Sequence, residues 1–71
     1  MTLQDLTELE YGMRLVHRTL KNADGTPMRF KVNGAPQAFK RNIANVRVPW
    51  KHGLWDYGYI TAQNAEEFEL A

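Results

Sequence analysis

The chain has 71 residues, which fits a single domain, and a domain of this size folds with a thin margin of stability. It contains no cysteine, which excludes disulfide bonds and thiolate metal sites, and no apolar run approaches the roughly 18 residues of a membrane-spanning helix. Since the composition, 44% hydrophobic and 24% charged, is that of an ordinary folded domain, we expect a small cytoplasmic protein without a membrane partner.

The charged residues are segregated along the chain. All nine basic residues lie between Arg14 and Lys51, with only Asp24 among them, and the other seven acidic residues flank this segment. Two explanations are open. Either the acidic ends fold over a basic sheet and neutralise it, or the basic segment forms a binding face.

The N-terminal segment has the pattern of a short helix. Thr2 is a suitable N-cap and Asp5 lies three residues further on. Leucines follow the spacing of one helical face, at Leu3, Leu6 and Leu9. We predict a helix over about residues 3–11 that ends at Gly12, and then a strand up to Leu20. The alternative is one helix that continues through Gly12 to Leu20, because Met13, Val16 and Leu20 extend the apolar face.

A turn and a half-buried strand are expected next. Residues 22–27 contain Asp24 and Gly25, a pair that supplies the positive φ of a turn, and Pro27 follows. Beyond them, apolar residues alternate with basic ones: Met28, Phe30 and Val32 with Arg29 and Lys31. This period of two predicts a strand whose basic residues face water.

Asn33 and Gly34 form the strongest short hairpin signal in the chain. We therefore predict that residues 36–40 return as an edge strand with Phe39 as its anchor. A polar connection over residues 41–45 would follow.

Residues 46–61 hold both tryptophans and two of the three tyrosines, and we predict two strands joined at His52 and Gly53. Pro49 indicates that the first of these strands is an edge or bends there. In the second strand one face carries three alternate aromatic residues, Trp55, Tyr57 and Tyr59.

These elements predict one β-rich α+β domain over residues 1–71. It has a short helical segment within residues 1–12 and a small antiparallel meander sheet, or a partly open barrel, of three to five strands. Residues 62–71 form a loosely ordered acidic tail, in which Asn64 and Glu67 could cap one helical turn, after which Phe68 and Leu70 could dock.

Catalysis has little support in the sequence. Serine and cysteine, the commonest nucleophiles, are both absent. His17 and His52 could form an acid–base pair, as in a small metal-free nuclease toxin, only if the fold brought them together. We therefore predict a non-enzymatic protein with no cofactor, no metal and no small-molecule substrate.

The aromatic residues of the segment 46–61 allow three interpretations. They are the core of the domain, or they stack nucleic-acid bases beside phosphate-binding Lys and Arg, or they anchor a protein partner. Arg29, Lys31 and Lys40 are further candidates for phosphate contacts. An exposed strand edge near Pro49 could also accept a strand from a partner.

The pattern of turns and anchors over about residues 19–64 resembles a group of short phage and prophage open reading frames. The resemblance lies in Thr19, Leu20, residues 22–27, residues 31–34, Lys40, residues 47–49, residues 51–54 and residues 57–61. It implies a phage origin and, by analogy with small phage proteins, a regulator that binds a host protein complex such as RNA polymerase in the host cytoplasm.

Our leading hypothesis is thus a phage-type regulator that occludes a surface of host RNA polymerase and so alters transcription. The alternative is a small barrel that binds single-stranded nucleic acid through the same side chains. The predicted partner-binding residues are Arg41, Arg47, Trp50, Lys51, Trp55, Tyr57 and Tyr59.

Overall fold

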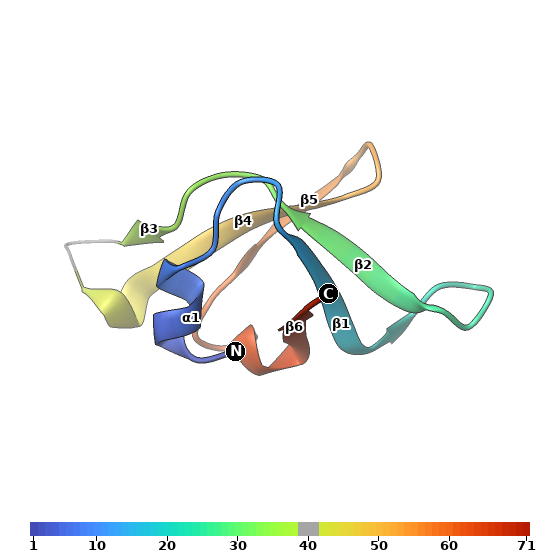
Figure 1. The fold of residues 1–71 in the computed structure, drawn as a ribbon, viewed down its shortest axis with the longest axis horizontal. Coiled ribbons are helices and arrows are strands. Elements are labelled where there is room, and N and C mark those ends of the chain that lie inside the picture. Colours follow the sequence, from blue (N-terminus) through green and yellow to red (C-terminus); the bar gives the residue numbers. More distant parts are fainter. Residues whose placement is uncertain (39–41) are drawn as a thin grey trace.

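The structure, a computed structural model, describes residues 1–38 and 42–71. It is a small β-rich α+β fold, as predicted, with one short helix and an antiparallel sheet (Figure 1). In chain order its elements are α1 (Leu3–Thr7), β1 (Arg14–Lys21), β2 (Pro27–Val32), β3 (Gln37–Ala38), the 3-10 turn η2 (Ile43–Asn45), β4 (Val46–His52), β5 (Asp56–Ile60), the 3-10 turn η3 (Ala65–Glu67) and β6 (Phe68–Leu70). No helix among the described residues is long and apolar enough to cross a membrane.

The sheet is centred on β4 and β2. Its strands follow the order β3-β4-β2-β1-β6, and β5 pairs with β4. β4 therefore has β5 on one side, and on the other side β3 at its beginning and β2 at its end. The sheet is curled but does not close into a barrel, and its sixth strand, β6, exceeds the predicted number.

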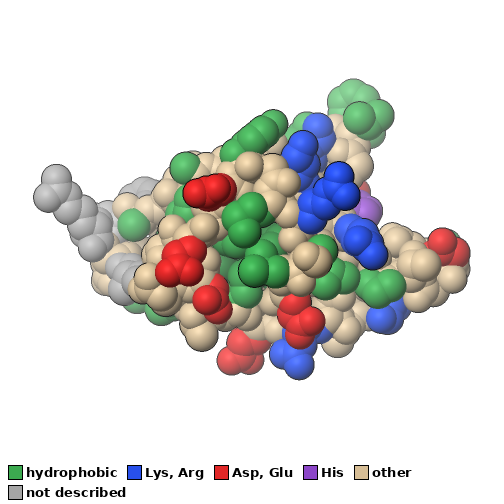
Figure 2. Space-filling view, in the orientation of Figure 1, with side chains coloured by type: hydrophobic (Ala, Val, Ile, Leu, Met, Phe, Trp, Pro, Cys, Tyr) green, Lys and Arg blue, Asp and Glu red, His purple; other side chains and the backbone are tan. Residues whose placement is uncertain are grey.

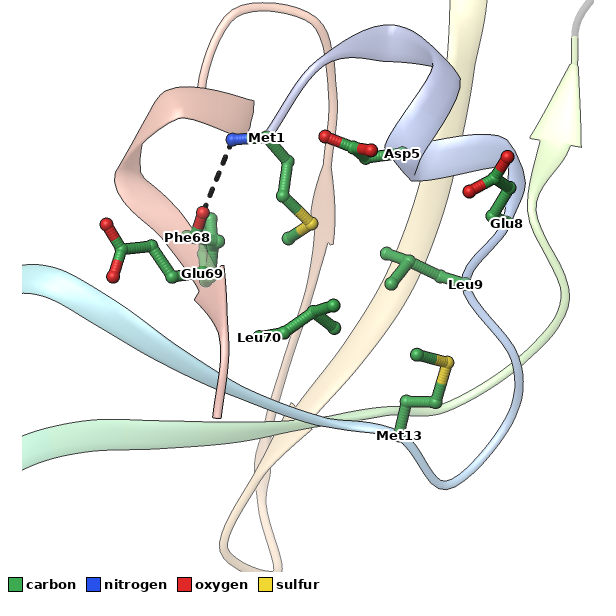
Figure 3. A pocket seen from close by; sticks show the side chains of 8 residues that line it. All are labelled: Met1, Asp5, Glu8, Leu9, Met13, Phe68, Glu69 and Leu70. Carbon is green, nitrogen blue, oxygen red and sulfur yellow. Dashed lines mark hydrogen bonds between the residues drawn. The ribbon is translucent and has the colours of Figure 1, made fainter.

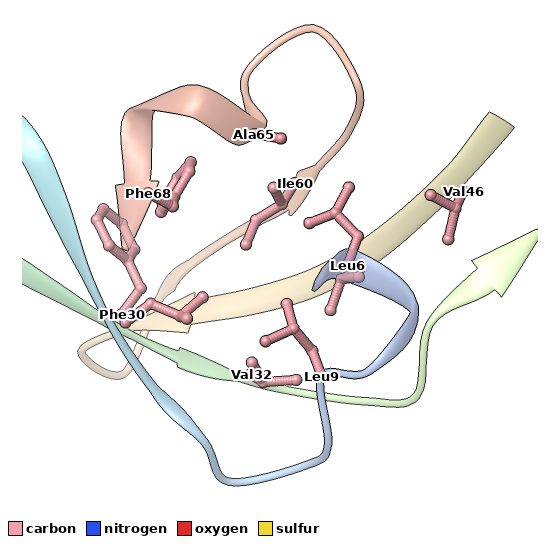
Figure 4. Packing of buried hydrophobic residues seen from close by; sticks show 10 residues of the cluster. Leu6, Leu9, Phe30, Val32, Val46, Ile60, Ala65 and Phe68 are labelled. Atoms are coloured by element: carbon pink, nitrogen blue, oxygen red, sulfur yellow. The ribbon is translucent and has the colours of Figure 1, made fainter. Parts of the chain in front are cut away.

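The core lies on one side of this sheet, which we call the inner face. Alternate strand residues point into it, and α1 and the C-terminal segment cover it (Figure 4). The buried hydrophobic residues are Leu6, Leu9, Leu15, Phe30, Val32, Val46, Val48, Ile60, Ala65 and Phe68. Because strand side chains alternate between faces, the residues between these point outward to what we call the outer face.

The predicted order of helix and then strand is confirmed, but the helix is shorter than expected. Thr2 and Asp5 form a capping box at its start. After the C-cap residue Glu8 the chain leaves the helical path, and the N–H of Gly12 donates to the carbonyl of Val32 (2.9 Å) and so joins the end of β2. Gly12 has a φ of 90°, which favours glycine.

The C-terminal segment is ordered, which corrects the expectation of a loose tail. η3 and β6 occupy most of it, and β6 pairs with β1 so that Phe68 lies opposite His17. Phe68 is buried, and the amino group of Met1 donates to the carbonyl of Ala65 (2.8 Å). One apolar anchor is enough to dock so short a strand at the edge of the sheet.

The hairpin predicted at Asn33 and Gly34 is wrong. β3 pairs with β4 rather than β2, and Gly34 lacks the positive φ that a tight hairpin turn needs. Instead the N–H of Asn33 donates to the carbonyl of Pro49 (2.8 Å), and a Cβ on Gly34 would lie 2.9 Å from Pro49 Cγ. The chain thus runs close alongside β4 here, from the end of β2 to β3. Phe39, the predicted anchor, and Lys40 lie outside the described residues.

Of the two alternatives predicted at Pro49, an edge strand or a bend, the edge strand is wrong, because β4 has partners on both sides. Pro49 lies between the residues that pair with β3, Val46 and Arg47, and those that pair with β2, Trp50 and Lys51. Pro49 has no N–H to donate, and this is tolerated because the partner of β4 changes from β3 to β2 at this residue.

Candidate functional site

Three basic residues lie directly opposite one another on the outer face. The register pairs Arg14 of β1 with Lys31 of β2, and Lys31 with Lys51 of β4. We call these three residues the basic row, and Tyr57 of β5 extends it. Like charges on opposite strand positions destabilise a sheet. The basic row therefore lowers the stability of the domain, and packing of the fold gives no reason for it.

Tyrosine rings accompany the cations of this face. The Nζ atom of Lys31 lies 5.6 Å from the ring centroid of Tyr11, and that of Lys51 lies 5.9 Å from the ring of Tyr57. At the other end of β4, Arg47 Cζ lies 4.5 Å from the ring of Tyr59. Cation–π contacts at exposed sites are worth roughly 0.5–1 kcal/mol, so they orient the charged groups without neutralising them.

A groove of about 430 Å³ runs along the basic row. Its lining combines cations and aromatic rings: Tyr11, Arg14, Arg29, Phe30, Lys31, Asn33, Lys51 and Gly53. Figure 2 shows Lys and Arg side chains gathered over β2 and the base of the β4–β5 hairpin, while acidic side chains lie mainly around α1 and the C-terminal segment. The outward positions of β2, β4 and β5 carry no acidic residue.

The acidic ends do not neutralise this face. α1 and the C-terminal segment cover the inner face, away from the basic row. The acidic C-terminal segment instead contacts β1: Arg18 pairs with Glu69 (Nε to Oε1, 3.2 Å), and His17 Nε2 lies 3.5 Å from Glu67 Oε1. The charge segregation of the sequence is therefore retained as separate surfaces in the fold.

The predicted partner-binding residues fall into different environments. Tyr57, Tyr59, Arg47 and Lys51 lie together on the outer face. Trp55 does not continue their stripe, because it lies in the turn after Gly53 and is 86% exposed. Arg41 lies outside the described residues.

Trp50 belongs to the inner face. Its ring packs edge-on against Phe30, with centroids 4.7 Å apart, and it lies against the backbone of Gly58. Its Nε1 atom is buried, and no described residue accepts its hydrogen. This tryptophan therefore contributes to packing rather than to an exposed anchor.

The fold brings the two histidines to one hollow of about 350 Å³ on the inner side, on either side of Phe30. The Nδ1 atom of His17 accepts hydrogen bonds from the N–H groups of Thr19 (3.2 Å) and Leu20 (3.0 Å). Its Nε2 lies 3.5 Å from Glu67 Oε1, so both ring nitrogens already have partners within the domain.

His52 Nδ1 lies 2.8 Å from the carbonyl of Arg29, which fixes that ring as well. No group of three or more metal-ligating side chains occurs among residues 1–38 and 42–71.

Tyr11, Arg14 and Lys31 were not among the predicted partner-binding residues, although Lys31 was noted as a source of charge. The signal for Lys31 was its alternation with apolar residues in β2. Its position opposite Lys51 depends on the pairing of β2 with β4, and the misleading hairpin signal at Asn33 and Gly34 concealed that pairing.

Comparison of the chain with models of protein families, with curated proteins and with solved structures found no match. The resemblance to phage open reading frames therefore remains a prediction, and function has to be argued from the outer face itself.

Proposed function

We propose that this domain binds single-stranded nucleic acid across the outer face of its sheet. The observation that carries the proposal is the basic row, in which Arg14, Lys31 and Lys51 stand opposite one another on adjacent strands. Each like-charge pair costs on the order of 0.2–1 kcal/mol in a sheet. A polyanion lying across the row would offset this repulsion and release its own counterions.

The aromatic residues favour a single strand over a duplex. Tyr11 and Tyr57 are 69% and 59% exposed; Tyr11 lies beside the central Lys31, and Tyr57 lies at one end of the basic row beside Lys51. Unpaired bases stack on such rings while Lys and Arg hold the phosphates, a combination that tolerates many sequences. Bases inside a duplex are not available for this contact.

The experiment is fluorescence anisotropy with a labelled oligonucleotide of mixed sequence at several salt concentrations. Three phosphate contacts predict a slope of log K against log salt of about −2 for a single strand, and Lys31→Gln should reduce its magnitude by about 0.7. Lys21→Gln is the matched control, because Lys21 is exposed on β1 but lies outside the row. Undetectable binding at low salt, or equal effects of the two variants, would refute the proposal.

A specific observation also favours a second candidate, the phage-type regulator that binds a host complex such as RNA polymerase in the host cytoplasm. Leu54 and Trp55 are 72% and 86% exposed in the turn between β4 and β5, which projects from the body of the domain (Figure 1). Exposed tryptophan is typical of the centre of protein interfaces.

This second candidate would act by occluding a surface of its partner. The test is a pull-down from a bacterial host lysate with the wild-type domain and with Trp55→Ala. Recovery of polymerase subunits by the wild type alone would favour it, and their absence from both eluates would count against it.

A further inference from the structure

A second surface of the molecule carries acidic residues where the basic row carries cations. A groove of about 390 Å³ lies between α1 and β6 (Figure 3). Its floor is apolar and adaptable, formed by Met1, Leu9, Met13 and Leu70. Its rim carries three acidic residues, Asp5, Glu8 and Glu69. We call this surface the acidic groove.

Two of the three acidic residues at the rim have no ion-pair partner among the described residues. Asp5 accepts a hydrogen bond from the N–H of Thr2 (2.9 Å), and Glu8 accepts one from the side chain of Gln4 (3.3 Å). Only Glu69 pairs with a cation, Arg18. An occupant of this groove should therefore combine apolar side chains with positive charge.

The chain itself carries a segment of that kind, which we call the hairpin tip: Leu54 and Trp55. Their side chains are more exposed than those of the other large hydrophobic residues described. Gly53 beside them lines the groove of the basic row together with Lys51 and Arg29, so cations border the tip on its outward side. Asp56, the one acid next to the tip, is paired opposite His52 and belongs to the inner side.

We propose that the hairpin tip of one copy of this chain docks into the acidic groove of a second copy. The apolar side chains would fill the methionine-lined floor, and Lys51 and Arg29 would face the acidic rim. The turn between β4 and β5 projects away from α1 and β6 (Figure 1), so tip and groove lie apart on one molecule and the contact has to form between two copies. Each copy offers one tip and one groove, which makes this an interface between unlike surfaces.

The room available fits such an occupant. Pockets of roughly 300–1,000 Å³ enclose whole small molecules, so about 390 Å³ accommodates the side chains of Trp55 and Leu54. Because attraction between exposed charges falls with ionic strength, association should weaken at high salt. This inference does not depend on nucleic-acid binding and is tested in its absence.

The experiment measures molar mass by light scattering and sedimentation over a concentration series from about 1 μM to about 1 mM, the range of transient contacts. Wild-type protein should exceed the monomer mass as concentration rises. A tip variant, Trp55→Ala, should weaken association at least about tenfold, as expected for a tryptophan anchor. Leu20→Ala is its matched control, since Leu20 is 50% exposed in the β1–β2 hairpin, away from the tip.

A groove variant, Glu8→Lys with Leu70→Gln, should have the same effect as the tip variant. Both residues are exposed, and a cation at position 8, the C-cap of α1, suits the end of a helix. The decisive sample is an equimolar mixture of the tip variant and the groove variant. It contains one intact tip and one intact groove, so it should form a 1:1 dimer although each variant alone stays monomeric.

Three results would overturn the proposal. The first is wild-type protein that stays monomeric over the whole series, in which case the groove serves no second copy. The second is a tip variant that associates as strongly as Leu20→Ala and the wild type. The third is a mixture that stays monomeric, which would show that tip and groove do not meet.

Discussion

The indole ring of Trp50 lies against the backbone of Gly58, its partner across β4 and β5. A Cβ atom at position 58 would come within 2.7 Å of Trp50 Cε2, closer than real Cβ atoms approach other groups. Trp50 is held from its other side by Phe30, at 4.7 Å between ring centroids. The contact between Trp50 and Gly58 therefore fixes β5, the strand that presents Tyr57 and Tyr59 on the outer face.

Gly58→Ala should destabilise the domain by about 1–3 kcal/mol, the usual cost of overpacking a well-packed site. The added methyl group has to displace either the indole ring or β5. Urea unfolding followed by circular dichroism measures the change. An unchanged unfolding midpoint would show that Trp50 is free to move away.

A double-mutant cycle with Trp50→Phe separates this contact from general effects on the strand. The smaller ring makes room for the methyl group, so Gly58→Ala should cost less in the Trp50→Phe background than in the wild type. Trp50→Phe also removes the buried indole N–H, which has no hydrogen-bond acceptor among the described residues. Loss of this unsatisfied donor offsets part of the stability that the smaller ring loses in packing.

Local patterns were sufficient to predict the elements that hold most of the site. The period of two in β2 predicted that Arg29 and Lys31 face water, and both side chains are exposed in the structure. The turn at Gly53, with a φ of 68°, was predicted from the pattern of residues 46–61. These features depend only on neighbours in the chain.

The parts that could not be predicted depend on pairing between distant segments. The basic row exists because β2 pairs with β4, whereas the signal at Asn33 and Gly34 indicated a local hairpin. β6 has only three residues and one buried anchor, Phe68, which leaves no periodic pattern to detect. Tertiary contacts decided both cases.

Lys31→Gln should stabilise the fold and weaken binding at once. It removes the central charge of the basic row, so two repulsive pairs, with Arg14 and with Lys51, disappear. The two pairs together cost about 0.4–2 kcal/mol, and the cation–π contact of Lys31 with Tyr11, which is lost as well, offsets part of this, so we expect a net gain of up to about 1 kcal/mol in the free energy of unfolding. Urea unfolding at low salt tests this, and the gain should shrink at high salt, where the repulsion is screened. A loss of stability would mean that the row is not under repulsion.

The two tryptophans should report different environments in fluorescence. Trp55 is 86% exposed, whereas Trp50 is packed between Phe30 and Gly58. Trp55→Phe should leave a blue-shifted emission that acrylamide quenches poorly. Trp50→Phe should leave a red-shifted emission that is quenched readily in dilute solution. Similar spectra for the two variants would contradict the placement of one of these residues.

The capping box of α1 predicts a loss of stability in acid. The backbone hydrogen bond from Thr2, and next the side-chain hydrogen bond with Thr2, hold the pKa of Asp5 below its ordinary value of 3.8. A lowered pKa in the folded state favours folding above that ordinary value, and the benefit is lost as the pH falls through the folded value. Urea unfolding between about pH 5 and about pH 2 should show this decline, and Asp5→Asn should make it shallower.

Asp24 provides an independent check of the same reasoning. The Thr26 hydroxyl and then the Thr26 N–H donate to its carboxylate (2.6 and 3.0 Å to Oδ1), and they lower the pKa of Asp24 in the β1–β2 turn. The two carboxylates have separate partners, so the effects of Asp5→Asn and Asp24→Asn on the acid decline should add. If the double variant lost stability below about pH 4 as steeply as the wild type, other groups would control acid unfolding.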